Sequence, residues 1–335
     1  MYPRVLAVLS FVAVAACAGS NTEGGNGVAI DVPEIEERSD VDDDPFTPVG
    51  SVDTVPGSAA TTSPSGESTS TTSTSTTSTT STSTTTTSST TTIPPVPDVS
   101  PCPPTGSHIW VNRPASTLAP PPLPDGWRTD SAGASVAGRD LTLLVREVDS
   151  PARTVLVIGG IHGNEPVSPP TVRGMVEATI PDDTEVWLLP LLNPDGSAAG
   201  TRCNSVGVDL NRNFSWTWRA DDGGPAPFSE PEPQAARALV ERLGPDLVVW
   251  VHQPLGYVSS IGDTPDTYEQ AWSAASGVPV RPDVTQHGGG ESWTAFDAGT
   301  PSMLIEIDSW EATADIVDAH VAGFDALLDV VVPVD

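Results

Sequence analysis

Two histidines and a glutamate are the residues of this chain whose types and positions could bind a catalytic metal. His162 and Glu165 are three residues apart in GGIHGNEP, directly after the apolar run TVLVI, and His252 follows another apolar run, DLVVWV. Catalytic zinc takes three His or carboxylate ligands and keeps a fourth position for water. The paired glycines, Gly159 and Gly160, allow the backbone to bend close to an ion. We therefore predict one zinc ion, held by His162, Glu165 and His252.

The alternative for a histidine at the end of a strand is a structural role with satisfied hydrogen bonds. The spacing His-x-x-Glu is weak evidence alone, because it arises often by chance. The positions of His162 and His252 after apolar runs favour the metal. For the other three histidines we predict the structural role: His108, His287 and His320.

The elements that must position these ligands follow from the apolar pattern. Short apolar runs predict strands covered on both faces, at residues 141–148, 154–160, 185–192, 246–252 and 302–308. Apolar residues spaced by three and four predict helices at 171–180, 232–244, 267–276 and 312–331. This alternation predicts an α/β fold, a single domain with a mixed, largely parallel central sheet and helices on both faces. In such sheets ligands bind beyond the carboxyl ends of strands, where His162, His252 and Glu306 stand.

Six motifs in order carry a family resemblance: HGNE, NPDG, GVDLNRNF, SEPE, HQPLG and IEI. From about Leu141 to the C-terminus, the chain resembles the zinc carboxypeptidase family, most closely its compact bacterial branch of murein peptide amidases (γ-D-glutamyl-diaminopimelate peptidases). The resemblance implies that His162, Glu165 and His252 bind zinc. It also implies that Glu306 is the general base that takes a proton from the attacking water. The alternative for Glu306 is a charge at an exposed strand end.

The resemblance assigns roles to four further residues. Asp209 is expected to hydrogen-bond the first zinc-binding histidine, with a turn residue as the alternative. Asn211 and Arg212 match the pair that holds the substrate's terminal carboxylate; a structural salt bridge is the alternative for Arg212. Arg202 matches the arginine that stabilises the oxyanion. The alternative for Arg202 is a surface residue on a turn, which a disulfide between the neighbouring Cys203 and Cys102 would hold.

Two motifs receive structural interpretations. NPDG is predicted to be a turn, since Asn-Pro and Asp-Gly are strong turn formers, and we give it no catalytic role. SEPE is predicted to begin a helix, with Ser229 before Pro231 and acidic residues in the first turn. The alternative is that Glu230 and Glu232 border the cleft.

The chain departs from the digestive carboxypeptidases in ways that concern the substrate. Those enzymes carry a tyrosine some twenty residues before the base, whereas this chain reads RPDVTQHGGGESW there. The third ligand lies in HQP rather than HSY, as in the murein branch. Glu291 falls near the region that sets side-chain preference, and an acidic residue would suit a substrate amine such as that of diaminopimelate. The alternative for Glu291 is a loop residue facing water.

The N-terminal third of the chain is predicted to export and tether the domain. Residues 1–16 are expected to be a lipoprotein signal peptide, because VAAC resembles a lipobox and makes Cys17 the lipidated residue. An ordinary signal peptide or an uncleaved anchor is the alternative. Residues 17–100 are acidic and then Ser/Thr-rich, which predicts a disordered tether, either bare or O-glycosylated. Residues 101–335 are expected to be the catalytic domain.

The cysteines bear on whether the protein contains a disulfide, and the net charge bears on which partners it can bind. Outside the cytoplasm, Cys102 and Cys203 are expected to form a disulfide, with two free thiols as the alternative. The formal charge of −30 and the absence of lysine argue against nucleic acid as a partner. The partners expected are a peptide or murein-peptide substrate and, through the lipid anchor, a membrane. The protein is expected to be a monomer.

The sequence therefore predicts a lipid-anchored, extracytoplasmic zinc hydrolase facing the cell wall. The reaction that the resemblance implies is cleavage of the amide bond between γ-D-Glu and diaminopimelate in a wall peptide. Alternatives are a general metallocarboxypeptidase, an N-acyl amino acid deacylase and a non-catalytic wall-binding module.

Overall fold

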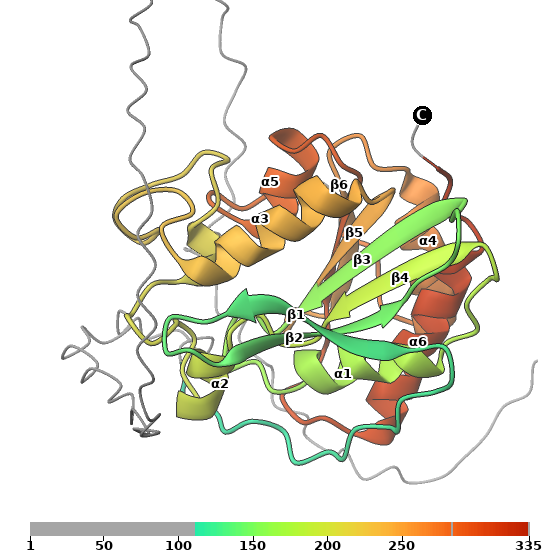
Figure 1. Ribbon diagram of the computed structural model, residues 1–335, viewed down its shortest axis with the longest axis horizontal. Helices are drawn as coiled ribbons and strands as arrows, with labels where there is room; N and C mark the ends of the chain where they lie inside the picture. The colour runs from blue at the N-terminus through green and yellow to red at the C-terminus, as the bar shows by residue number, and fades with distance from the viewer. Residues whose placement is uncertain (1–110, 283, 334–335) are drawn as a thin grey trace, which may run out of the picture. The chain divides into compact units, whose positions relative to one another are not determined.

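The computed structural model describes residues 111–282 and 284–333, and one sheet organises this part of the chain (Figure 1). Its seven strands lie in the order β1-β2-β4-β3-β5-β7-β6. The strands are β1 (Arg128–Ala134), β2 (Asp140–Arg146), β3 (Arg153–Gly159), β4 (Thr184–Leu189), β5 (Leu247–His252), β6 (Tyr257–Ile261) and β7 (Ser302–Glu306). The four central strands are parallel, while β1, β2 and β6 pair antiparallel at the edges. The mixed sheet confirms the predicted fold class.

Helices cover both faces of the sheet, as the alternating pattern predicted. They are α1 (Ser168–Gly174), α2 (Pro194–Ala199), α3 (Pro231–Leu243), α4 (Asp266–Ser276), α5 (Gly290–Phe296) and α6 (Ala314–Leu328), with short 3-10 helices at Met175–Glu177 and Leu210–Arg212. Side chains from α1, α4 and α6 form one buried cluster with the sheet. Side chains from α3 and α5 form a second cluster on the opposite face, and Figure 1 shows these two helices together on one side.

Strand β3 shows why the central strands read as continuous apolar runs. Successive side chains of a strand point to opposite faces. Val155 and Val157 pack into the cluster of α1, α4 and α6, whereas Leu156 and Ile158 pack into the cluster of α3 and α5. Both faces are buried along this stretch, so Val155 to Ile158 are all apolar.

The structure adds elements that the apolar pattern did not predict. Strands β1 and β6 were missed because β1 is almost wholly exposed and β6 carries two serines, so neither is a continuous apolar run. The prediction that NPDG is a turn is wrong: Asn193 is the N-cap of α2, and its side chain accepts a hydrogen bond from the Gly196 amide at 2.7 Å. Helix α5, which begins in GGGES, was also missed, because glycines disfavour helix interiors. The predicted helix start at SEPE is confirmed, since α3 begins at Pro231.

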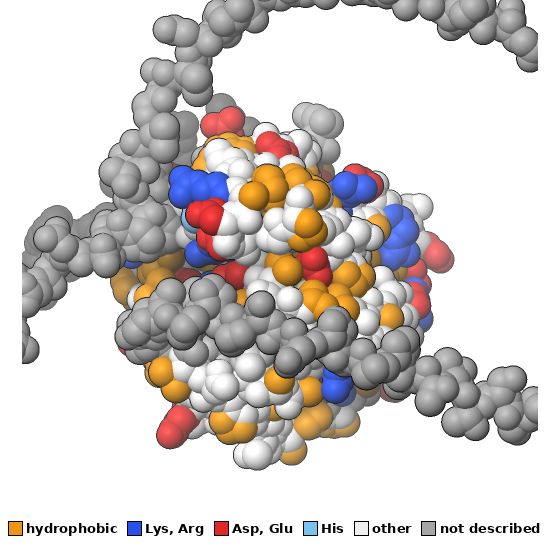
Figure 2. Space-filling model, turned by 90° about the vertical axis from the view of Figure 1, so that its left-hand side faces the viewer, with side chains coloured by type: hydrophobic (Ala, Val, Ile, Leu, Met, Phe, Trp, Pro, Cys, Tyr) orange, Lys and Arg blue, Asp and Glu red, His pale blue; other side chains and the backbone are white. Residues whose placement is uncertain are grey.

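Several predictions fall outside the described residues: the signal peptide, Cys17, the tether, Cys102 and His108. Within the described residues, no helix has both the length and the apolar character needed to cross a bilayer. On the face in Figure 2, arginine side chains are interspersed with acidic ones, and the described part of that face carries no continuous basic area.

Candidate metal centre and active site

The structure brings the three predicted ligands together at the carboxyl edge of the sheet. His162 and Glu165 lie in the loop between β3 and α1, and His252 is the last residue of β5. Ligand atoms of these three residues all lie within 4.8 Å of one another. Glu306 ends the neighbouring strand β7, where its register partner is His252. Residues from three adjacent strand ends therefore meet in one place.

The donor atoms of the cluster fit a bound cation. His162 Nδ1 lies 2.6 Å from Glu165 Oε1, and His252 Nδ1 lies 3.5 Å from Glu165 Oε2. All three side chains are buried. Within the described residues, Glu165 Oε2 and His252 Nε2 are buried without a hydrogen-bond partner. Buried polar atoms normally find partners, and two imidazoles with one carboxylate form a ligand set typical of catalytic zinc.

The electrostatics of the cluster favour an ionised carboxylate. Burial alone would raise the pKa of Glu165, but the two histidines outweigh burial and lower it to about 2. Conversely, burial would lower the pKa of His252, but the Glu165 carboxylate reverses the direction and raises it. The cluster thus stabilises positive charge beside Glu165, and a dication can supply that charge in place of protons.

Asp209 and Arg202 form a second layer behind the first histidine. Asp209 Oδ1 lies 3.1 Å from His162 Nε2, the ring nitrogen that faces away from Glu165. Arg202 Nε donates to Asp209 Oδ2 at 2.9 Å, and its Nη1 lies 3.6 Å from Glu165 Oε1. Burial opposes ionisation of Asp209, but Arg202 and His162 hold its pKa well below the usual range. Asp209 can therefore fix the orientation of the His162 ring.

Arg202 is only 6% exposed, so the alternative of a surface arginine on a turn is wrong. The next residue, Cys203, is buried and forms a disulfide. Its predicted partner, Cys102, lies outside the described residues.

Glu306, the predicted base, is buried beside the cluster of His162, Glu165 and His252. Its side chain is 7% exposed, and Oε2 accepts a hydrogen bond from the Leu255 amide at 3.3 Å. Burial and the nearby Glu165 raise its pKa to about 7, against the opposing influence of His252. A carboxyl group with a pKa near neutrality can both accept and return a proton.

The predicted carboxylate-binding pair lies beside this centre. Asn211 and Arg212 form the 3-10 helix that follows Asp209, whose side chain accepts from the Asn211 amide at 3.0 Å. Glu291, in the first turn of α5, is 1% exposed, and its Oε2 has no hydrogen-bond partner within the described residues. The negative charge of Glu291 acts to raise the pKa values of both Arg212 and His252. The alternative that Glu291 is a loop residue facing water is therefore wrong.

The HGNE and NPDG motifs pack against each other through their glycines. A Cβ atom on Gly163 would lie 1.9 Å from the Gly196 carbonyl carbon, so the two backbones touch. Asn193 Nδ2 donates to the Ile161 and Arg202 carbonyls at 3.2 Å each. Gly160 adopts φ +59°, a conformation that favours glycine. The sequence analysis gave NPDG a structural role without chemistry, and its asparagine and glycine support the loop that carries His162 and Glu165.

Gln253 is a second residue whose contribution the sequence analysis missed. It follows the ligand His252, and its Oε1 accepts hydrogen bonds from the amides of Val167 and Ser168, at 2.7 and 3.2 Å. These amides begin α1, two residues after Glu165. Gln253 thus joins the two segments that carry the predicted metal ligands. The glutamine in HQP was a signal for this contact, because free amides at a helix start need an acceptor.

The histidines outside the centre differ from each other. His287 makes hydrogen-bonding contacts with Asp222 and Gln286, as a structural histidine should. His320 lacks the satisfied hydrogen bonds that were predicted for it: its Nδ1 is buried without a hydrogen-bond partner among the described residues, and burial lowers its pKa to about 4.

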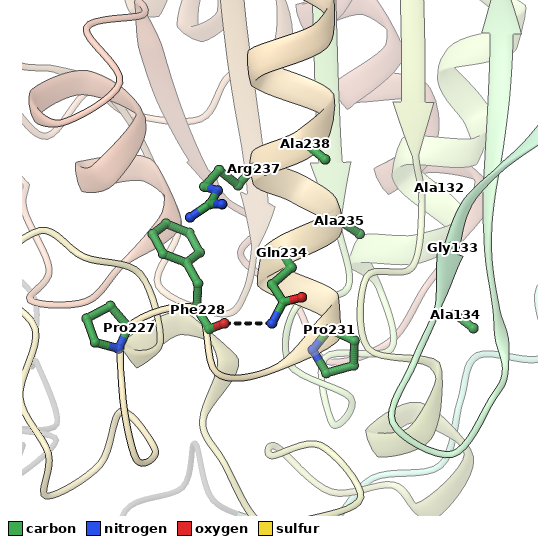
Figure 3. Close-up of a pocket in the computed structure, with 10 residues that line it drawn as sticks. All are labelled: Ala132, Gly133, Ala134, Pro227, Phe228, Pro231, Gln234, Ala235, Arg237 and Ala238. Carbon is green, nitrogen blue, oxygen red and sulfur yellow. Dashed lines mark hydrogen bonds between the residues drawn. The ribbon is translucent and has the colours of Figure 1, made fainter. Parts of the chain in front are cut away.

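A hollow of about 540 Å³ lies away from the metal centre, between β1 and α3 (Figure 3). Its ionisable lining residue is Arg237, whose guanidinium stands 4.8 Å from the Phe228 ring centre. Gln234 Nε2 donates to the Phe228 carbonyl at 2.8 Å, as the dashed line shows. None of the predicted site residues lines this hollow, so it is not the place of the chemistry.

Comparisons with known proteins agree with this geometry. Residues 123–263 match the zinc carboxypeptidase family, a range that includes the three predicted ligands but ends before Glu306. Murein peptide amidase A of Escherichia coli K12 is 32% identical over 148 residues, which cover 39% of this chain and 61% of that protein. The chain therefore matches less than two thirds of this relative's length. The Vibrio campbellii murein peptide amidase A is 29% identical over 219 residues, 59% of this chain and 86% of the relative.

A solved structure supports the fold alone. Bovine thrombin-activatable fibrinolysis inhibitor, solved with tick carboxypeptidase inhibitor, superposes with a TM-score of 0.52 at 16% identity. The superposition covers 62% of this chain and 91% of the other.

Proposed function

We propose that this chain, which carries a domain of the zinc carboxypeptidase family, is a zinc-dependent amide hydrolase that cleaves murein peptides between γ-D-Glu and diaminopimelate. The observation that carries the proposal is the buried set of His162, Glu165 and His252, with Glu306 on the adjacent strand end. The relatives named murein peptide amidase A support the choice of substrate.

His162, Glu165 and His252 would hold one zinc ion. When bound, zinc supplies a Lewis acid that acidifies water and polarises the scissile carbonyl. Glu306 takes the proton from the attacking water and delivers it to the leaving amine. Arg202, which Asp209 holds in a fixed orientation, stabilises the negative charge that develops on the carbonyl oxygen. Asp209 also keeps the His162 ring in place.

Asn211 and Arg212 would bind the free carboxylate of the residue that is released, because a guanidinium and an amide can donate several hydrogen bonds to one carboxylate. Glu291 supports diaminopimelate as that residue. It is buried near Arg212 and His252, on which its charge acts, with an oxygen that lacks a partner among the described residues, and diaminopimelate carries a second ammonium group that could pair with it. A neutral side chain would leave that carboxylate unpaired.

The cellular setting is part of the proposal. Cys17 would carry the lipid anchor, residues 17–100 would let the domain reach the wall, and the protein would act as a monomer outside the cytoplasm. The VAAC motif and the Ser/Thr-rich composition support this setting.

The test is release of diaminopimelate from L-Ala-γ-D-Glu-diaminopimelate by the purified chain, with and without a chelator. We expect release that stops with the chelator and returns with zinc. Removal of C-terminal residues from ordinary peptides, without release of diaminopimelate, would assign a general carboxypeptidase instead. No hydrolysis of either substrate would contradict the proposal and favour the deacylase or wall-binding alternatives.

A further inference from the structure

Asn211 and Arg212, the proposed carboxylate-binding pair, contact a chain segment that has no role in the proposed mechanism. Segment 286–290 leads into α5, and the Gly290 amide donates to Asn211 Oδ1 at 2.8 Å. This bond occupies the amide oxygen of Asn211. It therefore leaves the NH2 group as the part of the side chain that can donate to a carboxylate.

Arg212 is held at two of its three nitrogens. Nη1 donates to the Asn211 carbonyl at 2.8 Å, and Nε lies 3.4 Å from Asp222 Oδ2. With the Gln286 amide oxygen turned toward it, Nε also donates to Gln286 at 3.2 Å. Nη2 has no hydrogen-bond partner among the residues that the structure describes. Contacts at both ends of the guanidinium fix its plane and leave Nη2 for a ligand.

Asp222 is itself held by a contact to His287 and through the loop that carries it. Its Oδ2 lies 3.0 Å from His287 Nε2, and His287 Nδ1 lies 2.9 Å from the Gln286 amide. The loop that carries Asp222 is joined to segment 286–290 by backbone hydrogen bonds, from Gly288 to the Trp216 carbonyl (2.8 Å) and from Phe214 to the Gly288 carbonyl (3.0 Å).

Gly288 shows how closely these segments meet. It adopts φ +62°, and a Cβ atom there would lie 2.2 Å from the Arg212 carbonyl oxygen. Backbone contacts between the segments, together with one ion pair, therefore fix the position of Asp222 relative to Arg212.

We propose that Asp222 is a positioning residue: with His287 behind it, Asp222 orients Arg212 to receive the terminal carboxylate of the substrate. This inference rests on the proposed function. The competing interpretation is that Asp222 occupies Arg212 and competes with the substrate. The geometry favours positioning, because Asp222 contacts Nε at 3.4 Å while its shorter contact goes to His287.

The test measures binding without turnover. In a Glu306→Gln background of the full zinc-loaded chain, calorimetry gives the Kd for L-Ala-γ-D-Glu-diaminopimelate with and without Asp222→Asn. We expect Asp222→Asn to raise this Kd about tenfold, because the ion pair that orients Arg212 is lost. Asp221→Asn is the matched control, since Asp221 is the exposed neighbour with the same charge, and it should leave Kd unchanged.

A coupled variant separates positioning from general damage. In an Arg212→Gln background, Asp222→Asn should change Kd by less than about twofold, because the residue it orients is gone. An unchanged or lower Kd for Asp222→Asn alone would overturn the inference, and a lower Kd would identify Asp222 as a competitor. An equal loss with and without Arg212 would also overturn it. No binding by the Glu306→Gln chain itself would refute the proposed function, and the inference with it.

Discussion

Replacing Glu232 by glutamine is predicted to stabilise the protein above pH 7 and to destabilise it slightly, by about 1 kcal/mol, near pH 4.5. Glu232 is 0% exposed in the first turn of α3. Its Oε1 accepts from the Val136 amide at 3.2 Å, while Oε2 is buried without a partner among the described residues. Burial, together with Asp195 and Glu230, raises its pKa from 4.5 to about 7.

The sign of the effect follows from proton linkage. Between about pH 4.5 and 7 the folded state keeps the Glu232 proton that the unfolded state has lost. The free energy of unfolding therefore falls as the pH rises through this window, and it stays lowered above it. A shift of this size corresponds to about 3 kcal/mol at most. The glutamine NH2 group would itself lack a partner, at a cost of about 1 kcal/mol, so the expected net gain at pH 8 is about 1 to 2 kcal/mol.

Urea unfolding followed by tryptophan fluorescence, at pH 4.5 and pH 8, measures this difference. Glu241→Gln is the matched control, because Glu241 lies on the same helix with its side chain 64% exposed; it should change stability little at either pH. A Glu232→Gln protein that is less stable than wild type at pH 8, or that shifts equally at both pH values, would refute the reasoning.

Three further predictions concern the site. Glu306→Gln should reduce kcat at least about a thousandfold and leave zinc content unchanged, as measured by steady-state kinetics and metal analysis; retained turnover would exclude Glu306 as the base. Asp209→Asn should weaken zinc binding about 10- to 100-fold in a competition titration, and wild-type affinity would mean that Asp209 does not support His162. Gly163→Ala should lower the free energy of unfolding by at least about 2 kcal/mol, because its methyl group would overlap the Gly196 backbone; an unchanged Tm would show that these backbones are not in tight contact.

The sequence was a good guide where a single physical requirement dominates. Residues Val155 to Ile158 of strand β3 had to be apolar because both faces of the strand are buried, and this pattern predicted a strand covered on both faces. His162 and His252 were found in the same way, since strand ends are where an α/β sheet places its chemistry. Both are now seen beside Glu165.

The residues that the sequence analysis missed act through contacts between distant segments. Nothing local shows that Gly163 touches Gly196, or that Gln253 supports the start of α1, since both contacts depend on how loops meet in three dimensions. Asn193 was misread for a related reason. The residue types that favour a turn also favour a helix N-cap, and only the following backbone distinguishes the two.

Zinc binding to the metal-free chain tests the central claim most directly. Equilibrium dialysis should give one zinc per wild-type chain and none at the same free zinc concentration for a Glu165→Ala, His252→Ala variant that keeps the wild-type circular dichroism spectrum. Wild-type stoichiometry in that folded variant would place the zinc elsewhere and contradict the assignment of the metal centre.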